Sequence, residues 1–354
     1  MKETRSYPYT NNTIKIKTRI SSPCTRIAES KNFERTEEQS CLKKRIKTIN
    51  TPVDSGHGKR FFYAMVWLLT IAIYTPVPVS ASEGGGSAYP NGAEGFFAGV
   101  VPPPGQYLIN YFSYYRADRL NDAAGNKLPL DFKLSVTANT LRYIHITDKK
   151  ILGGFWGWHV LLPILNVDVE VGGNTDKKTG LGDIIISPLV LSWHSPSFHY
   201  AVGLDFYLPT GSYDKNALAN TSRNYYTFEP VLVGTYLAEN GFQTSAKFMY
   251  DVNTENKDTR YKTGQEFHFD YTLAKTIDPW SFGVGGYYYE QITDDERNGI
   301  KIGNRGKTIA LGPQVFYGTK DWSFSLKWHH EVETINRPEG NWLWFKFIFS
   351  QLNV

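Results

Sequence analysis

The stretch Glu-Phe-His-Phe-Asp-Tyr-Thr-Leu at residues 266–273 alternates between polar and apolar residues without a break. Successive side chains of a β-strand point to opposite faces, so one face carries Phe267, Phe269 and Tyr271 and the other carries ionisable groups. In a bilayer the apolar face must contact lipid, because a charged side chain there costs about 2–4 kcal/mol at the midplane. The ionisable face would then line a wet interior, which predicts a transmembrane β-barrel.

Segments with the same alternation, separated by clusters of Gly, Asn, Asp and Pro, continue on both sides of this stretch. We predict strands over residues 105–116, 131–147, 155–171, 181–194, 198–209, 224–238, 241–252, 261–275, 280–290, 306–318, 321–334 and 341–350. The predicted fold class is all-β: a 12-stranded antiparallel up-and-down transmembrane β-barrel over residues 105–354, preceded by an N-terminal segment, 82–104.

The connections between these strands alternate in length. Long polar connections follow most odd-numbered strands, at 117–130, 172–180, 210–223, 253–260 and 291–305, whereas tight ones such as 195–197 and 239–240 follow even-numbered strands. Outer-membrane barrels have short periplasmic turns and long external loops, so the N- and C-termini of the barrel are both expected to lie in the periplasm. Aromatic residues near strand ends are expected in the interfacial girdles, namely Tyr143, Trp193, Tyr236, Trp280 and Trp322.

A polar N-terminal part precedes the barrel. Residues 1–58 lack a sustained apolar period and are predicted to be a disordered basic leader. Residues 59–81 are typical of a signal peptide, because a basic pair precedes a 14-residue apolar run that prolines stop short of the about 20 residues a transmembrane helix needs. Cleavage is predicted between Ala81 and Ser82, with export to the outer membrane. The alternative is an uncleaved anchor with a cytoplasmic tail. A true start codon downstream of Met1 would explain the long stretch before the signal peptide.

The net charge of +4 averages two unlike parts of the chain. Residues 1–81 carry 14 basic and 6 acidic residues, whereas residues 82–354 carry 24 and 28, a net charge of −4. The basic pI therefore belongs to the N-terminal part and does not indicate a nucleic-acid partner. Cys24 and Cys41 both precede residue 82, which excludes disulfides, thiolate metal sites and cysteine nucleophiles from the barrel.

An ordered set of short motifs carries a family resemblance. The motifs are EGGGS at 83–87, YPNGAE at 89–94, PPPGQY at 102–107, GLGD at 180–183, LPTGSY at 208–213, Glu229-Pro230, GGYY at 285–288 and Gly312-Pro313. With these motifs the chain resembles a bacterial family linked to the meta-pathway of phenol degradation, over nearly all of residues 83–349. The resemblance implies an outer-membrane barrel that takes up small hydrophobic solutes, aromatic compounds among them.

The resemblance also implies insertion into outer-membrane lipid by the outer-membrane assembly machinery, which usually reads an aromatic residue at the end of the last strand. This chain ends Phe349-Ser350-Gln351-Leu352-Asn353-Val354. Either Phe349 supplies that signal from within the chain, or assembly is less efficient.

Uptake of an apolar solute needs apolar contact in the lumen, worth about 25 cal/mol per Å² of buried surface. Strands 224–238 and 341–350 carry apolar residues on both faces, so parts of the lumen wall are expected to be apolar. Ionisable and aromatic residues assigned to the inner face are expected to line the solute pathway. They are Asp168, Glu170, Asp183, Asp205, Tyr207, Glu229, Lys247, Asp251, Glu266, His268, Asp270, Lys327, Trp342, Trp344 and Lys346.

The barrel sequence does not point to an enzyme. It contains no dinucleotide fingerprint, P-loop, H-E-x-x-H or G-x-S-x-G motif. An outer-membrane hydrolase would need a histidine paired with an acid or a serine at one rim. The candidates are His268 between Glu266 and Asp270, and the pair His329-His330. We expect a channel without catalytic, cofactor or metal sites; the alternatives are an adhesive or structural barrel that binds partners through its long loops, and a hydrolase.

Overall fold

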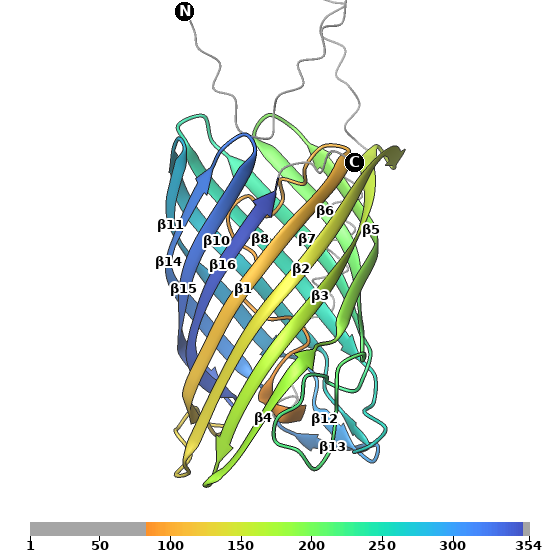
Figure 1. Cartoon of the computed structure of the whole chain (residues 1–354), viewed down its shortest axis with the longest axis vertical. Coiled ribbons are helices and arrows are strands. Elements are labelled where there is room, and N and C mark those ends of the chain that lie inside the picture. The colour runs from red at the N-terminus through yellow and green to blue at the C-terminus, as the bar shows by residue number, and fades with distance from the viewer. Residues whose placement is uncertain (1–82, 350–354) are drawn as a thin grey trace, which may run out of the picture. The chain divides into compact units, whose positions relative to one another are not determined.

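The computed structural model describes residues 83–349, and its regular structure is almost entirely β-strand (Figure 1). The strands of the main sheet are β1 (Gly105–Leu120), β2 (Phe132–Ile151), β3 (Gly154–Val171), β4 (Asn174–Leu181), β5 (Ile184–His194), β6 (Phe198–Leu208), β7 (Thr227–Leu237), β8 (Phe242–Asn253), β10 (Glu266–Ile277), β11 (Trp280–Gln291), β14 (Lys307–Gly318), β15 (Trp322–Ile335) and β16 (Pro338–Phe349). All neighbours pair antiparallel, and β1 pairs with both β2 and β16, so the sheet closes into a barrel. Closure satisfies the backbone N–H and C=O groups within the protein, as hydrocarbon requires.

Two short strands share one position in the barrel wall. β3 pairs with β5 along its first half and with β4 along its second half. Only Gly182 and Asp183 separate β4 from β5. The thirteen strands of the sheet therefore fill twelve wall positions, which confirms the predicted 12-stranded antiparallel barrel.

The long connection predicted over residues 172–180 is wrong. β3 and β4 are joined by Gly172 and Gly173 alone, both in the left-handed region with φ of 57° and 81°. Two glycines in this conformation make a two-residue hairpin turn, so the residues that follow form a strand. The sequence concealed β4 because the strand is polar and exposed along most of its length.

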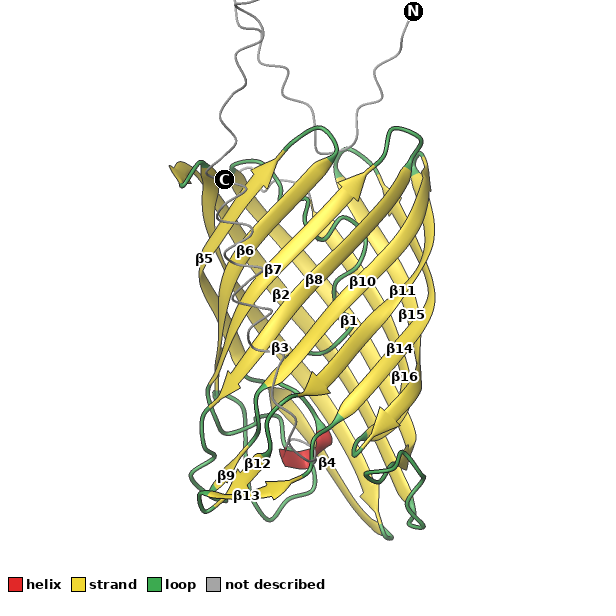
Figure 2. Ribbon diagram, turned by 180° about the vertical axis from the view of Figure 1, so that it is seen from behind, coloured by secondary structure: helices red, strands yellow, loops and turns green. Residues whose placement is uncertain are grey.

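The two ends of the barrel differ (Figure 2). At the short-turn end, neighbouring strands are joined by tight turns such as 195–197 and 278–279. At the opposite, long-loop end, most of the connections are longer, apart from the two-residue connections β3–β4 and β15–β16, and a separate small sheet is present. Its strands are β9 (Tyr261–Lys262), β12 (Asp295–Arg297) and β13 (Ile300–Gly303).

The outer face of the barrel is apolar and the inner face of several strands is polar. In β10 Leu273 is 46% exposed whereas His268 is fully buried, and in β15 Trp328 is 45% exposed whereas Lys327 is buried, as the alternation predicts. Large apolar side chains are exposed around the whole barrel, including Phe112, Leu141, Leu162, Ile164, Val252, Phe282, Val284, Leu311, Leu326 and Leu343. Such a belt is what contact with lipid requires.

Aromatic rings gather on the outer face at the short-turn end. Trp280 packs against Tyr317 with ring centroids 4.7 Å apart, and Trp322 stacks on Phe347 at 5.9 Å. Both tryptophans begin their strands directly after a tight turn, as expected for an interfacial girdle.

Residues 83–104 do not join the wall but lie inside the barrel (Figure 2). After a 3-10 turn, η2 (Glu83–Gly85), the chain runs from the long-loop end to β1 at the short-turn end. The Glu83 carboxylate accepts a hydrogen bond from Asn256, and the Gly99 amide donates to Thr235 at 2.8 Å. No helix within residues 83–349 is long and apolar enough to cross a bilayer. The predicted leader, signal peptide and cleavage site, residues 1–82, lie outside the described residues.

Candidate solute pathway in the barrel lumen

The N-terminal segment 83–104, called the plug below, is held by a carboxylate on the inner wall. Asp270 on β10 accepts a hydrogen bond from the Tyr89 hydroxyl at 2.6 Å. It accepts two more, from the amides of Gly92 and Glu94, at 2.7 and 2.9 Å. Gly92 has φ of 87°, and a Cβ there would lie 2.6 Å from a histidine ring on the wall, so only glycine allows this close approach.

Basic residues on β15, β16 and β2 also hold the plug. Lys327 on β15 donates to three consecutive plug carbonyls, those of residues 92–94, at 2.5, 2.7 and 2.8 Å. The Glu94 carboxylate lies 2.6 Å from Lys346 Nζ on β16 and 3.2 Å from Arg142 Nη1 on β2. The plug is therefore fixed by charge-assisted hydrogen bonds, which are stronger than neutral ones.

A cavity of about 630 Å³ lies between the plug, the long loops and the barrel wall, and most strands of the wall contribute to its lining. The largest apolar part of this lining belongs to β2, β3 and β5. Its lining residues are Leu134, Val136, Leu161, Pro163, Leu165, Val167, Val169 and Ile185. Ala88, Tyr89 and Pro90 of the plug also line this cavity.

Polar groups form a floor between the cavity and the plug. Arg142 Nη2 lies 2.9 Å from His159 Nδ1, and His159 Nε2 lies 3.3 Å from Asp205. Lys247 Nζ sits 4.2 Å from the centroid of the Tyr89 ring, in cation–π contact. The cavity is therefore amphipathic, with an apolar wall and a charged floor.

The connection between β6 and β7, residues 209–226, lines this cavity at the long-loop end. Asp183 fixes it by accepting hydrogen bonds from the amides of Gly211 at 3.1 Å and Arg223 at 2.8 Å. The Arg223 guanidinium in turn donates to two plug carbonyls, each at 3.2 Å. Ala219 packs among the apolar residues of the β3 wall, so the loop folds inward onto the cavity.

All but two of the residues predicted to line the solute pathway lie on the inner side of the barrel. They are Asp183, Asp205, Tyr207, Glu229, Lys247, Asp251, Glu266, His268, Asp270, Lys327, Trp342, Trp344 and Lys346. Six of them border the cavity: Asp183, Asp205, Tyr207, Lys247, Trp342 and Trp344. The others contact the plug or each other. Passage of a solute along them stays a prediction.

The inner position predicted for Asp168 and Glu170 is wrong. Both side chains lie on the outer face near the long-loop end, where they pair with Lys177 at 3.3 Å and Lys133 at 2.8 Å. The intervening valines of β3 line the cavity instead. The rule that places charges inward holds only where the outer face meets hydrocarbon. Beyond that level the outer face meets water. The residues of β3 there still alternate, but the charged ones point outward and the apolar ones point inward.

Neither candidate hydrolase arrangement forms an accessible site. His329 is fully buried and His330 exposed, so the two rings lie on opposite faces of β15 and cannot act as a pair. His268 is fully buried against Tyr89 of the plug, with ring centroids 5.3 Å apart. Neither His268 nor His329 borders the cavity.

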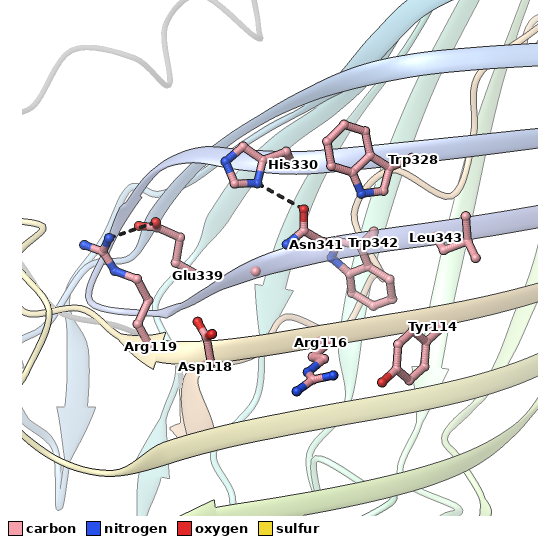
Figure 3. A pocket seen from close by; sticks show the side chains of 11 residues that line it. Tyr114, Arg116, Asp118, Arg119, Trp328, His330, Glu339, Asn341, Trp342 and Leu343 are labelled. Atoms are coloured by element: carbon pink, nitrogen blue, oxygen red, sulfur yellow. Dashed lines mark hydrogen bonds and ion pairs between the residues drawn. The ribbon is translucent and has the colours of Figure 1, made fainter.

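A second hollow, of about 430 Å³, lies on the outer face of the barrel (Figure 3). It is bordered by Tyr114 and Arg116 of β1 and by Trp328 and His330 of β15. His330 Nδ1 lies 3.0 Å from the Asn341 side-chain oxygen. Aromatic and cationic side chains side by side are typical of the level where a membrane protein meets polar lipid groups.

The apolar wall of the cavity is the feature that sequence reasoning missed. From residue 155 to residue 165 both faces of β3 are largely apolar, so alternation alone does not say which face is inside. A signal was nevertheless present further along the strand. Val167 and Val169 alternate with Asp168 and Glu170, and reading those carboxylates as outward places both valines inside.

Comparison with known proteins places the chain in a family. The family model described as "Putative MetA-pathway of phenol degradation" matches residues 117–347, which begin within β1 and end within β16. The chain belongs to this family. No curated protein matches the sequence.

Solved structures show which fold this phenol-degradation family member has. The COG4313 outer membrane channel from Pseudomonas putida F1 matches with a TM-score of 0.64 at 16% identity, covering 70% of this chain and 96% of that chain. The β domain of the Bordetella autotransporter BrkA gives a TM-score of 0.42 at 10% identity, covering 70% of this chain and all of that one. At 16% identity the first match shows the fold alone. This member of the family has the β-barrel fold of that outer membrane channel.

Proposed function

We propose that this barrel is an outer-membrane channel for the uptake of small hydrophobic solutes, aromatic compounds among them. The observation that carries the proposal is the cavity of about 630 Å³ with an apolar wall on β2 and β3. An apolar solute gains about 25 cal/mol for each Å² that it buries there. The charged floor at Arg142, His159 and Asp205 offers hydrogen bonds to a hydroxyl or carboxyl group on such a solute.

The plug and the loops support this function over the alternatives. A plug fixed by Asp270, Lys327 and Lys346 narrows the lumen, which disfavours bulk leakage of hydrated solutes. The 209–226 connection folds onto the cavity, which suits control of a solute site better than adhesion to a distant partner. The phenol-degradation family to which the chain belongs supports an aromatic solute.

Uptake can be tested with two neighbouring substitutions on β3. Leu165→Trp fills the cavity from its apolar wall, whereas Ile164→Trp places the same ring on the outer face, where Ile164 is 57% exposed. We expect the initial rate of uptake of a radiolabelled aromatic hydrocarbon by expressing cells to fall at least tenfold with Leu165→Trp and to stay unchanged with Ile164→Trp. Cells are preferred to plain liposomes, because a lipopolysaccharide-covered membrane slows spontaneous permeation.

Folding of both variants is checked by the heat-dependent shift of the barrel in gel electrophoresis. Equal uptake by two folded variants would show that solute does not pass through the cavity, and the proposal would fail.

A further inference from the structure

Three carboxylates and one histidine meet on the inner wall, apart from the cavity. Glu229 lies on β7, Asp251 on β8, and Glu266 and His268 on β10; all four are 0% exposed. The register of β8 and β10 sets Asp251 directly opposite Glu266. Like charges directly opposite each other destabilise a strand pair, so this arrangement calls for a positive partner.

The side chains around the cluster do not supply that partner in full. Tyr207 donates to Glu229 Oε2 at 3.0 Å, and Tyr289 donates to Glu266 Oε1 at 2.7 Å. The second oxygen of each glutamate and both oxygens of Asp251 accept no hydrogen bond from any residue within 83–349. Lys247 Nζ stands 3.7 Å from Glu229, beyond hydrogen-bond distance. Buried carboxylates without donors are costly, so each free oxygen points to a missing cation.

We propose that Glu229, Asp251 and His268 bind one divalent transition-metal ion of the zinc class. One ligand atom from each of the three lies within 4.8 Å of the others. His268 Nε2 is 3.4 Å from Asp251 Oδ2 and 3.8 Å from Glu229 Oε2, and neither His268 nitrogen has a hydrogen-bond partner among the described residues. Tetrahedral ligands with zinc bonds of about 2.0–2.2 Å lie about 3.4 Å apart, so little movement is needed.

The donor set favours zinc over calcium or magnesium, because an imidazole is a poor ligand for those hard cations. Two carboxylates neutralise a divalent ion, and Glu266, opposite Asp251, is placed to act as a fourth ligand.

The ion would tie together three neighbouring strands where the plug rests on them. Tyr89 of the plug lies against His268, with ring centroids 5.3 Å apart, and its hydroxyl donates to Asp270 on the same strand. The site is therefore structural, and it stands whether or not the cavity carries a hydrophobic solute.

The site can be tested by equilibrium dialysis of zinc against the detergent-purified full chain. The background protein, in which all variants are made, carries Cys24→Ser and Cys41→Ser. His268→Ala removes the proposed nitrogen ligand, and Asp251→Asn removes one charge with little change of shape. His329→Ala is the matched control, because His329 is also fully buried inside the barrel but hydrogen-bonds Gln314. His199→Ala controls for adventitious binding, because His194 and His199 face each other with Nδ1 atoms 3.0 Å apart.

We expect one zinc per chain in the background protein and in both controls, with affinity at least tenfold weaker in His268→Ala and Asp251→Asn. Cobalt should give a visible absorption band that is lost in His268→Ala.

Four outcomes would overturn the proposal: a correctly folded background protein that binds no zinc at micromolar concentration, unchanged binding by His268→Ala, loss of binding only in His199→Ala, or displacement of zinc by equimolar calcium. The first would show that shared protons balance the carboxylates.

Discussion

The two sides of the lumen are built in opposite ways. On the side of β10, β15 and β16, buried charges such as Asp270 and Lys327 each hold three groups of the plug. On the side of β2 and β3, residues such as Leu165 and Val167 border an open cavity. Hydrogen bonds to charges are directional and costly to break, so they fix one segment in one position. Apolar contact has no preferred direction, so that side can accept solutes of different shape.

The largest expected effect comes from releasing the plug. Asp270→Ala leaves the amides of Gly92 and Glu94 without their acceptor, at about 1–3 kcal/mol for each buried group. We expect conductance in planar bilayers to rise severalfold and to become noisy. The control is Asp168→Ala, which removes an outer carboxylate with an exposed ion pair worth about 0–1 kcal/mol. Equal conductance of the two variants would mean that the plug does not narrow the pathway.

A smaller effect is expected at the boundary between the two sides. Arg142 contacts Glu94 of the plug and His159 of the cavity floor, so Arg142→Met removes a positive charge from both. Because a charge in a narrow lumen sets the local potential, we expect the reversal potential in a salt gradient to shift toward cation preference. Arg116→Met, at the outer hollow of Figure 3, removes the same charge from the outer face and should leave the reversal potential unchanged. A shift in both variants would show that the reversal potential does not distinguish a charge in the lumen from a charge on the outer face.

The smallest effect concerns the small sheet of β9, β12 and β13 at the long-loop end, which belongs to neither side of the lumen. Asp295 accepts hydrogen bonds from the Tyr261 hydroxyl, the Gly264 amide at 2.8 Å and Gln291 at 2.6 Å. Burial raises the pKa of Asp295 to about 6, against its hydrogen bonds, which lower it. The packed loops therefore bind the proton more tightly than opened loops do. The stability that protonated Asp295 contributes to the packed loops is fully present below about pH 4 and is lost as the pH rises through about 6.

We therefore expect proteolysis of the loop around Asp295 to be a few-fold faster at pH 7.5 than at pH 5. Asp295→Asn should flatten this difference, and Asp214→Asn, in an exposed part of another loop, should preserve it. Rates are compared between variants at each pH, which cancels the pH dependence of the protease. A difference that survives in Asp295→Asn would assign the effect to another group.

The sequence predicts the barrel well because lipid imposes a period of two wherever a strand crosses it, as at Phe267, His268 and Phe269. It predicts β4 and the outward side chains of Asp168 and Glu170 poorly, because strands that extend beyond the hydrocarbon lose that constraint. It also predicts the inner charges without their partners. Asp270, Lys327 and Lys346 read as wall residues, and only the fold brings them to the plug.

The separation between the plug and its anchors in the chain has a consequence for biogenesis. The plug is translated before the barrel, yet Lys346, which binds Glu94, follows it by 252 residues. Contacts between such distant residues form late, after the intervening strands have paired. A half-assembled barrel that lacks β16 therefore also lacks one of the anchors of its plug. The last strand therefore both closes the wall and completes the set of contacts that hold the plug.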